Sequence, residues 1–271
     1  MLKSLFRRAA AALGLATLLL GAPAAAKAPA HPALWEVTDP DTTIYLFGTF
    51  HALDGDSHWF ASGVRNAFEQ SNELVLETLL PEGPDAGREL RDAMPRPAVA
   101  PSPSFLATTK MAISASRAEG MQVDHGADTV LRHIAEAEGK PVEQLETLQF
   151  QLNMFNHMPA ASTPPAGAKA GQAIDQESME SLTTMMARMQ SAWKRGDQSV
   201  FVHLLDEMQA NSPETYRMMF TERNARWADW ISARMQTPGT VFVAVGAGHL
   251  AGPDSLLVRL AERGIPSRRV Y

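Results

Sequence analysis

The stretch Thr240-Val-Phe-Val-Ala-Val-Gly-Ala-Gly-His249 decides the fold class. Residues Thr240 to Val245 form a continuous apolar run, which is typical of a strand buried on both faces of a sheet. The glycine that follows is expected to let the backbone turn sharply and to lift His249 over the end of the strand. Strands of this kind occur in α/β proteins, where helices cover both faces of the sheet.

Strand and helix patterns alternate along the rest of the chain. Trp35–Val37 and Thr43–Phe47 flank the turn residues Asp39-Pro40-Asp41, which predicts a β-hairpin. Residues Ile174–Met235 lack strand patterns and predict about three helices. Further strands are expected at Glu73–Glu77, Pro141–Thr147 and Arg268–Tyr271, and further helices at Trp59–Ser71, Phe105–Glu119, Asp128–Gly139, Gln149–Met158 and Pro253–Arg263.

These patterns predict one α/β domain over residues 29–271, with a mixed central β-sheet flanked by helices and a helical insertion. Two segments rich in proline and small residues, Pro81–Pro103 and Pro159–Gly171, bury too little apolar surface to belong to the core. We expect them to flank the cleft as lids, the first with a short helix.

Residues 1–28 have the layout of a secretory signal peptide. Basic residues including Arg7 and Arg8 precede an apolar stretch of about 13 residues, shorter than the roughly 20 that a membrane-spanning helix needs. Cleavage is expected after Ala26 or Ala28. The sequence therefore predicts an exported protein, periplasmic or secreted, with no transmembrane span after cleavage.

The amino-acid composition excludes several kinds of functional site and argues against one class of partner. The chain has no cysteine, which excludes disulfides, thiolate metal sites and cysteine nucleophiles. A metal ion must therefore bind through nitrogen and oxygen. The formal charge is -6 and basic residues form no runs, which argues against nucleic acid as a partner.

Four predicted strands end in one of two short motifs. Gly48–His51 and Gly246–His249 both read Gly-x-x-His, while Glu77 and Glu146 each stand in Leu-Glu-Thr. This repetition predicts two pseudo-symmetric halves. Ligands of open α/β sheets gather at the carboxyl ends of the strands, so these side chains are expected at one edge. Two imidazoles and one or two carboxylates are a ligand set for a divalent ion such as zinc or manganese.

Structural interpretations of the same residues stay open. A histidine after a glycine can be an ordinary loop residue, and a strand-end glutamate can cap a helix or pair with an arginine. Gly246-Ala-Gly248 also matches half of a dinucleotide-binding turn, but no acidic residue ends a following strand to hold a ribose. The serine-hydrolase elbow, the His-Glu-x-x-His helix and the Walker loop are absent from the sequence.

A set of stretches together resembles the TraB/PrgY/GumN family, to which the Tiki proteases belong. They are Leu34–Val37, Thr43–His51, Leu74–Glu77, Gly126–Asp128, Leu145–Thr147, Glu222–Asn224 and Val245–Leu250. The resemblance covers nearly the whole chain after the leader. It implies a fold similar to that of the Tiki, erythromycin-esterase-like and ChaN-like proteins, with two pseudo-symmetric halves.

The resemblance also implies a metal-dependent, peptidase-like hydrolase. Its divalent ion, manganese, cobalt or zinc, would be held by His51, His249 and Glu77, and Glu146 would be the counterpart of Glu77 in the second half. The expected substrate is a peptide or a small ester or amide. Because both histidines lie in predicted loops at the surface, their substitution is expected to spare the fold.

Arg223 and Asn224 complete the set of expected catalytic residues, on a helix. The guanidinium of Arg223 would bind a carboxylate or stabilise an oxyanion, or would instead orient Glu77 or Glu146. Two other functions remain open. One is an envelope protein that binds haem or metal without turnover, as the ChaN-like resemblance suggests, and the other is an envelope protein whose site has decayed.

Overall fold

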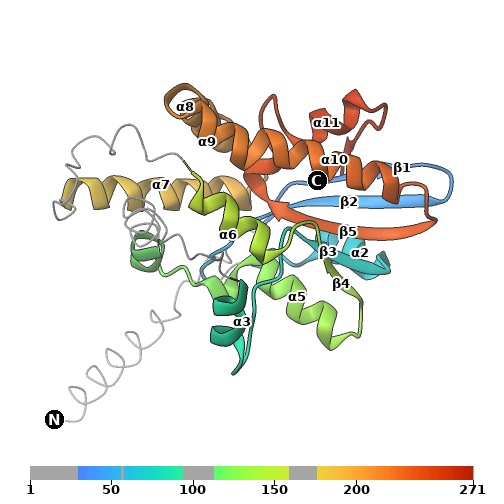
Figure 1. The fold of residues 1–271 in the computed structure, drawn as a ribbon, viewed down its shortest axis with the longest axis horizontal. Helices are drawn as coiled ribbons and strands as arrows, with labels where there is room; N and C mark the ends of the chain where they lie inside the picture. Colours follow the sequence, from blue (N-terminus) through green and yellow to red (C-terminus); the bar gives the residue numbers. More distant parts are fainter. Residues whose placement is uncertain (1–29, 56–57, 94–112, 159–175, 271) are drawn as a thin grey trace, which may run out of the picture.

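The computed structural model describes residues 30–55, 58–93, 113–158 and 176–270. Within them, a six-stranded mixed sheet lies between two layers of helices (Figure 1). The predicted signal peptide and the predicted lid Pro159–Gly171 lie outside the described residues, as does much of Pro81–Pro103. None of the described helices has the length and apolar character needed to cross a membrane.

The sheet has the strand order β4-β3-β5-β2-β1-β6. The neighbouring strands β4, β3, β5 and β2 run parallel, whereas β1 pairs antiparallel with both β2 and β6. The predicted hairpin is confirmed, and Asp39 Oδ1 closes its turn by accepting from the backbone N–H of Thr42 at 2.7 Å. The strands are β1 Leu34–Thr38, β2 Thr42–Thr49, β3 Glu73–Leu76, β4 Val142–Gln144, β5 Gly239–Gly246 and β6 Arg268–Arg269.

The predicted helices are confirmed where the structure describes them, with shifted ends. The predicted strand up to Thr147 is shorter than expected, because the Thr147 hydroxyl accepts from Phe150 N at 3.1 Å and caps the next helix. Residues 113–118 are the described helical part of Phe105–Glu119. The helices are α2 Ser62–Gln70, α3 Ala86–Ala93, α5 Ala127–Ala137, α6 Leu148–Asn156, α7 Gln176–Lys194, α8 Ser199–Asn211, α9 Pro213–Tyr216, α10 Glu222–Arg234 and α11 Leu256–Glu262.

Short turns of other helix types join these elements. Val123–His125 and Ala247–Leu250 are 3-10 turns, and Arg217–Thr221 is a π-turn between α9 and α10. π-turns inside α-helices occur often at functional sites. This one ends two residues before Arg223, for which the family resemblance implies a catalytic role.

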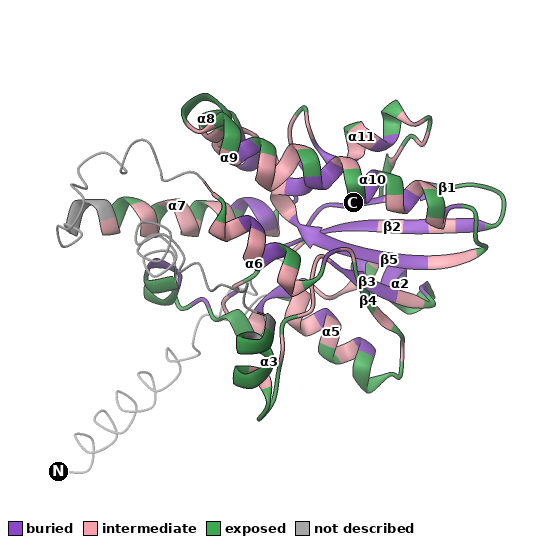
Figure 2. Ribbon diagram, viewed as in Figure 1, coloured by how far each residue is buried: buried purple, intermediate pink, exposed green. Residues whose placement is uncertain are grey.

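Each face of the sheet packs against its own apolar cluster. Phe47 and Phe242 pack on the face covered by α2, α5, α7 and α8. Val243 packs with Trp227 and Ile231 of α10 on the other face. Strands β2 and β5 are buried along most of their length, as the apolar run predicts (Figure 2).

The carboxyl ends of β2, β5, β3 and β4 form one continuous row, because these four neighbours are parallel. The row brings His51, His249, Glu77 and Glu146 to the same edge of the sheet. The inference of two pseudo-symmetric halves stays a prediction, since the strand order gives a single row.

Candidate functional site

Three of the predicted site residues converge over Gly246, the last residue of β5. A Cβ placed on Gly246 would lie 3.2 Å from His51 Nε2, 3.5 Å from Glu77 Oε2 and 3.6 Å from His249 Cδ2. Its backbone N–H also donates to Glu77 Oε2 at 3.1 Å. The position over Gly246 that a Cβ would occupy is therefore bordered by side chains from three neighbouring strand ends.

The glycines of the two Gly-x-x-His motifs are needed for space and not for backbone freedom. Gly246 has a φ of -51°, which any residue adopts, and Gly48 is not among the glycines with positive φ. The chain does turn after β5, into the 3-10 turn Ala247–Leu250, but this turn does not require the conformational freedom of a glycine. A Cβ on Gly48 would lie 3.1 Å from Ala247 Cα, so this glycine permits the close approach of the two strand ends.

His249 is buried, contrary to the expectation of a surface position. Its Nδ1 lies 2.7 Å from Asn224 Oδ1, and Asn224 Nδ2 donates to the carbonyl of Asp254 at 2.8 Å. Because an amide oxygen only accepts, Nδ1 of His249 carries the proton and Nε2 carries the lone pair. The rings of Phe220 and Trp227 lie 4.9 and 4.4 Å from the imidazole, between centroids.

The pKa of His249 is lowered to about 3. Burial is the largest cause, and the charge of Arg223 adds to it against the opposing effect of Glu77. The ring is therefore neutral over the physiological pH range, with a lone pair ready to accept a hydrogen bond or bind an ion.

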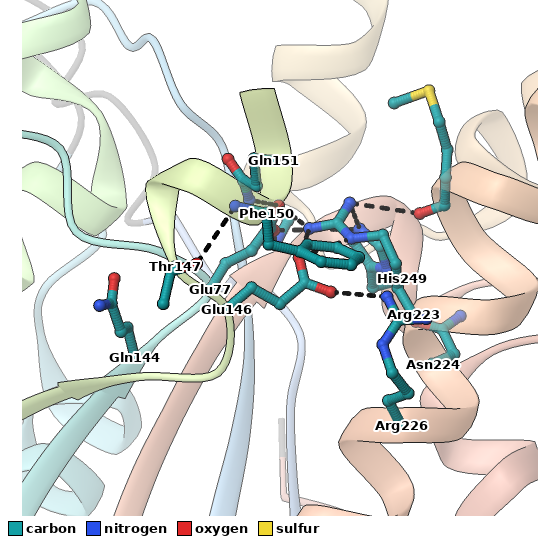
Figure 3. A network of polar contacts seen from close by, with 12 residues as sticks. Glu77, Gln144, Glu146, Thr147, Phe150, Gln151, Arg223, Asn224, Arg226 and His249 are labelled. Carbon is teal, nitrogen blue, oxygen red and sulfur yellow. Dashed lines mark hydrogen bonds and ion pairs between the residues drawn. The ribbon is translucent and has the colours of Figure 1, made fainter. Parts of the chain in front are cut away.

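Arg223 connects the other polar groups of the site (Figure 3). It is 2% exposed, and its guanidinium donates from Nη2 to Glu77 Oε1 at 2.5 Å and from Nε to Glu146 Oε2 at 2.8 Å. Nη1 lies 3.2 Å from His249 Nε2. Of the roles expected for Arg223, the contacts fit the one in which its guanidinium pairs with Glu77 and Glu146 and orients them.

Glu146 is engaged at both carboxylate oxygens. Oε2 binds Arg223, and Oε1 accepts from Arg226 Nη2 at 3.1 Å. The Arg226 guanidinium lies 4.6 Å from the ring centre of Phe150, which is part of the first turn of α6 (Figure 3). Glu146 therefore serves to hold the two arginines, while Glu77 faces the space over Gly246.

Glu77 is ionised at neutral pH. Desolvation raises the pKa of Glu77, but His249 and Arg223 beside it have the larger, opposite effect and bring the pKa down to about 2. Oε1 also accepts from Gln151 Nε2 at 3.1 Å. Oε2 accepts from the backbone N–H of Gly246 and is the oxygen of Glu77 that borders the position over this residue.

His51 lies on the loop after β2, and its side chain is 60% exposed. Nδ1 lies 3.3 Å from Oδ2 of Asp128, on the first turn of α5. Desolvation lowers the pKa of His51, but the Asp128 carboxylate outweighs it and raises the pKa to about 9. Solvent around the exposed ring screens part of this effect.

Sequence reasoning missed two of these contacts. Asp128 belongs to one of the stretches that carry the family resemblance, but no strand-end pattern points to it. Gln151 follows the Leu-Glu-Thr motif inside α6 and has no sequence signal of its own. Both lie in the first two turns of helices that begin at the carboxyl edge of the sheet, where ligands of open α/β folds bind.

The donor set suits a divalent ion in its chemistry, with two imidazoles and one ionised carboxylate around one point. The space that a Cβ on Gly246 would fill is bordered by all three. Among the described residues, however, no group of three or more His, Asp or Glu side chains has the arrangement needed to hold a metal ion. The lone pair of His249 Nε2 faces Arg223 instead, so an ion requires that contact to open.

Comparisons with known proteins give one match. The sequence profile of the TraB/PrgY/gumN family matches residues 33–105 and 101–269. No curated protein and no solved structure matches the chain.

Proposed function

Because the chain belongs to the TraB/PrgY/gumN family, we propose that it is a peptidase-like hydrolase of amide or ester bonds whose centre is the space over Gly246. The convergence of His51, Glu77 and His249 on that space carries the proposal. Each of these side chains is also held by a further partner, Asp128, Arg223 or Asn224, as ligands and catalytic groups in enzymes commonly are.

A divalent ion, manganese, cobalt or zinc, would be held by His51 Nε2, Glu77 Oε2 and His249 Nε2. When bound, such an ion supplies Lewis acidity and lowers the pKa of a water molecule to about 7. Glu77 and His249 are already deprotonated at neutral pH, with pKa values of about 2 and about 3. His51 Nε2 is the donor that must release a proton, because Asp128 raises the pKa of this ring to about 9.

Arg223 is placed to act on the substrate once it leaves His249. Its Nε and Nη2 remain fixed by Glu146 and Glu77, and Nη1 also donates to the carbonyl of Met219 at 3.2 Å, so the second N–H of Nη1 is the one that becomes available. A guanidinium N–H can donate to a carbonyl oxygen that becomes negative in the transition state. The two glutamates hold the guanidinium in place, so this donor costs little reorganisation when the reaction occurs.

Purified protein, treated with a chelator and then supplied with manganese, cobalt or zinc, tests the proposal on a mixed peptide library and a panel of small esters. We expect ion-dependent cleavage by the parent and none by His51→Ala. Absence of turnover with all three ions, together with a shifted haem absorbance band on titration, would replace the proposal by the ligand-binding alternative.

We also propose that the protein is exported and that residues 29–271 form the mature domain. The basic, apolar and small-residue order of residues 1–28 supports this. Mass spectrometry of protein from the cell envelope should find a first residue of Lys27 or Pro29. A chain that starts at Met1 would contradict it.

A further inference from the structure

The two Gly-x-x-His motifs hold their histidines through different partners. His249 Nδ1 lies 2.7 Å from the amide oxygen of Asn224, whereas His51 Nδ1 lies 3.3 Å from the carboxylate of Asp128. Asn224 makes a second hydrogen bond, because its Nδ2 also donates to the carbonyl of Asp254 at 2.8 Å. A carboxylate has no N–H and could not donate this second hydrogen bond.

Asp128 makes no second hydrogen bond of this kind among the described residues. Its Oδ1 is buried and has no hydrogen-bond partner among the described residues, and its Oδ2 faces His51. A buried oxygen without a hydrogen-bond partner is costly, and the contact of His51 with Oδ2 leaves Oδ1 unpartnered within the described part of the chain. The contact that the structure shows is the one with the His51 ring.

The backbone fixes Asp128 beside His51 independently of the two side chains. The N–H of Ala127 donates to the carbonyl of Phe50 at 3.0 Å. A Cβ on Gly126 would lie 2.4 Å from the carbonyl oxygen of His51, which only a glycine avoids. The loop after β2 and the beginning of α5 therefore form one joined unit.

We infer that Asp128 is a positioning residue, which holds the His51 ring with Nδ1 toward its carboxylate and Nε2 toward the space over Gly246. The two sequence-equivalent motifs are thereby made inequivalent, one supported by a carboxylate and the other by an amide. Outer partners of this kind typically change metal affinity 10–100-fold when they are removed. The effect on an ion rests on the proposed function, but the orientation of the ring does not.

A purely structural role for Asp128 is the competing explanation. Asp128 is the acidic residue in the first turn of α5, where a negative charge favours the helix. That role depends on the charge alone and is indifferent to which ring nitrogen of His51 carries the proton. The tautomer of His51 therefore separates the two explanations.

The test compares Asp128→Ala, which removes the acceptor, with Asp128→Asn, which keeps an acceptor oxygen but removes the charge. Asp124→Ala is the matched control, since Asp124 is an exposed acid on the 3-10 turn just before α5. Long-range ¹H–¹⁵N spectra of the metal-free protein at pH 10, where the ring is neutral, report which nitrogen of His51 is protonated. Calorimetry with Mn²⁺ and Zn²⁺ then gives the ion affinity.

We expect the proton on Nδ1 of His51 in the parent, in Asp128→Asn and in the control, and a shift toward Nε2 in Asp128→Ala alone. Ion affinity should fall by about 10–100-fold in Asp128→Ala and less in Asp128→Asn. A parent ring protonated on Nε2, or one unchanged in Asp128→Ala, overturns the inference. If the tautomer follows the expectation but the parent binds neither ion, the metal proposal fails while the positioning role stands.

Discussion

Nη1 of Arg223 lies 3.2 Å from Nε2 of His249, the ring nitrogen whose lone pair an ion would use. The ring is neutral and its other nitrogen is bound to Asn224, so the guanidinium takes the position of a cation at this ligand. Ion binding at His249 and the Arg223–His249 contact therefore exclude each other.

Arg223→Gln should destabilise the metal-free protein by about 3–5 kcal/mol, because it leaves Glu77 without its arginine partner and leaves Glu146 with Arg226 alone. A divalent ion can neutralise Glu77, so added Mn²⁺ or Zn²⁺ should raise the unfolding midpoint of this variant more than that of the parent. Urea unfolding with and without ion measures both effects. Arg217→Gln, a change at an exposed ion pair, should cost under about 1 kcal/mol and leave the ion response unaltered.

The two histidines should differ in their effect on stability although the proposed function requires both. His51 is largely exposed, so His51→Ala should cost under about 0.5 kcal/mol. His249→Ala leaves a cavity between Phe220 and Trp227 and unpairs Asn224, at about 2–4 kcal/mol. Ion binding and hydrolysis should be lost in both. Thermal unfolding and calorimetry decide, and an ion affinity that survives either change would show that the histidine is not a ligand.

Alanine at the two motif glycines should separate stability from function. Gly246→Ala fills the space between His51 and Glu77 and should abolish ion binding, while its ordinary φ keeps the stability change within about 1 kcal/mol. Gly48→Ala meets the backbone of Ala247 at 3.1 Å and should cost about 1–3 kcal/mol. It leaves the donor atoms uncovered, so ion binding should persist. If calorimetry instead shows that Gly246→Ala still binds the ion and Gly48→Ala does not, the ion does not bind over Gly246.

Acid should weaken the metal-free fold through Glu77. Its pKa in the folded protein is about 2, below the roughly 4.3 of an unfolded glutamate, so the stability it contributes is present above that value. It is lost as the pH falls toward 2. The free energy of unfolding of Glu77→Gln should therefore fall less steeply than that of the parent between pH 5 and pH 2.5, with chelator present. Glu89→Gln, at an exposed position on α3, should follow the parent, and parallel curves for parent and Glu77→Gln would refute the shift.

Much of the fold followed from local patterns. The apolar run Thr240 to Val245 predicted the buried strand β5, and the turn residues Asp39-Pro40-Asp41 predicted the β1–β2 hairpin. Element ends were less predictable, because side-chain contacts decide them. The Thr147 hydroxyl, for example, begins α6 where the sequence pattern suggested that a strand continues.

The candidate site was predictable as a set of residues but not as a set of contacts. Strand-end motifs placed His51, Glu77 and His249 at one edge, since parallel neighbours end together. The burial of His249 and its contact with Arg223 depend on how α10 packs across β5, which no local pattern encodes. The pairing of Asp128 with His51 likewise depends on the approach of a loop to α5.

Anomalous X-ray diffraction from crystals soaked with Mn²⁺ or Zn²⁺ tests the central claim most directly, because it locates the ion and Arg223 in one measurement. The account predicts an anomalous peak over Gly246, about 2.0–2.2 Å from His51 Nε2, Glu77 Oε2 and His249 Nε2, with Nη1 of Arg223 moved away from the ring. A protein that hydrolyses peptides while its crystals show no peak there, and Arg223 still bonded to His249, would contradict it.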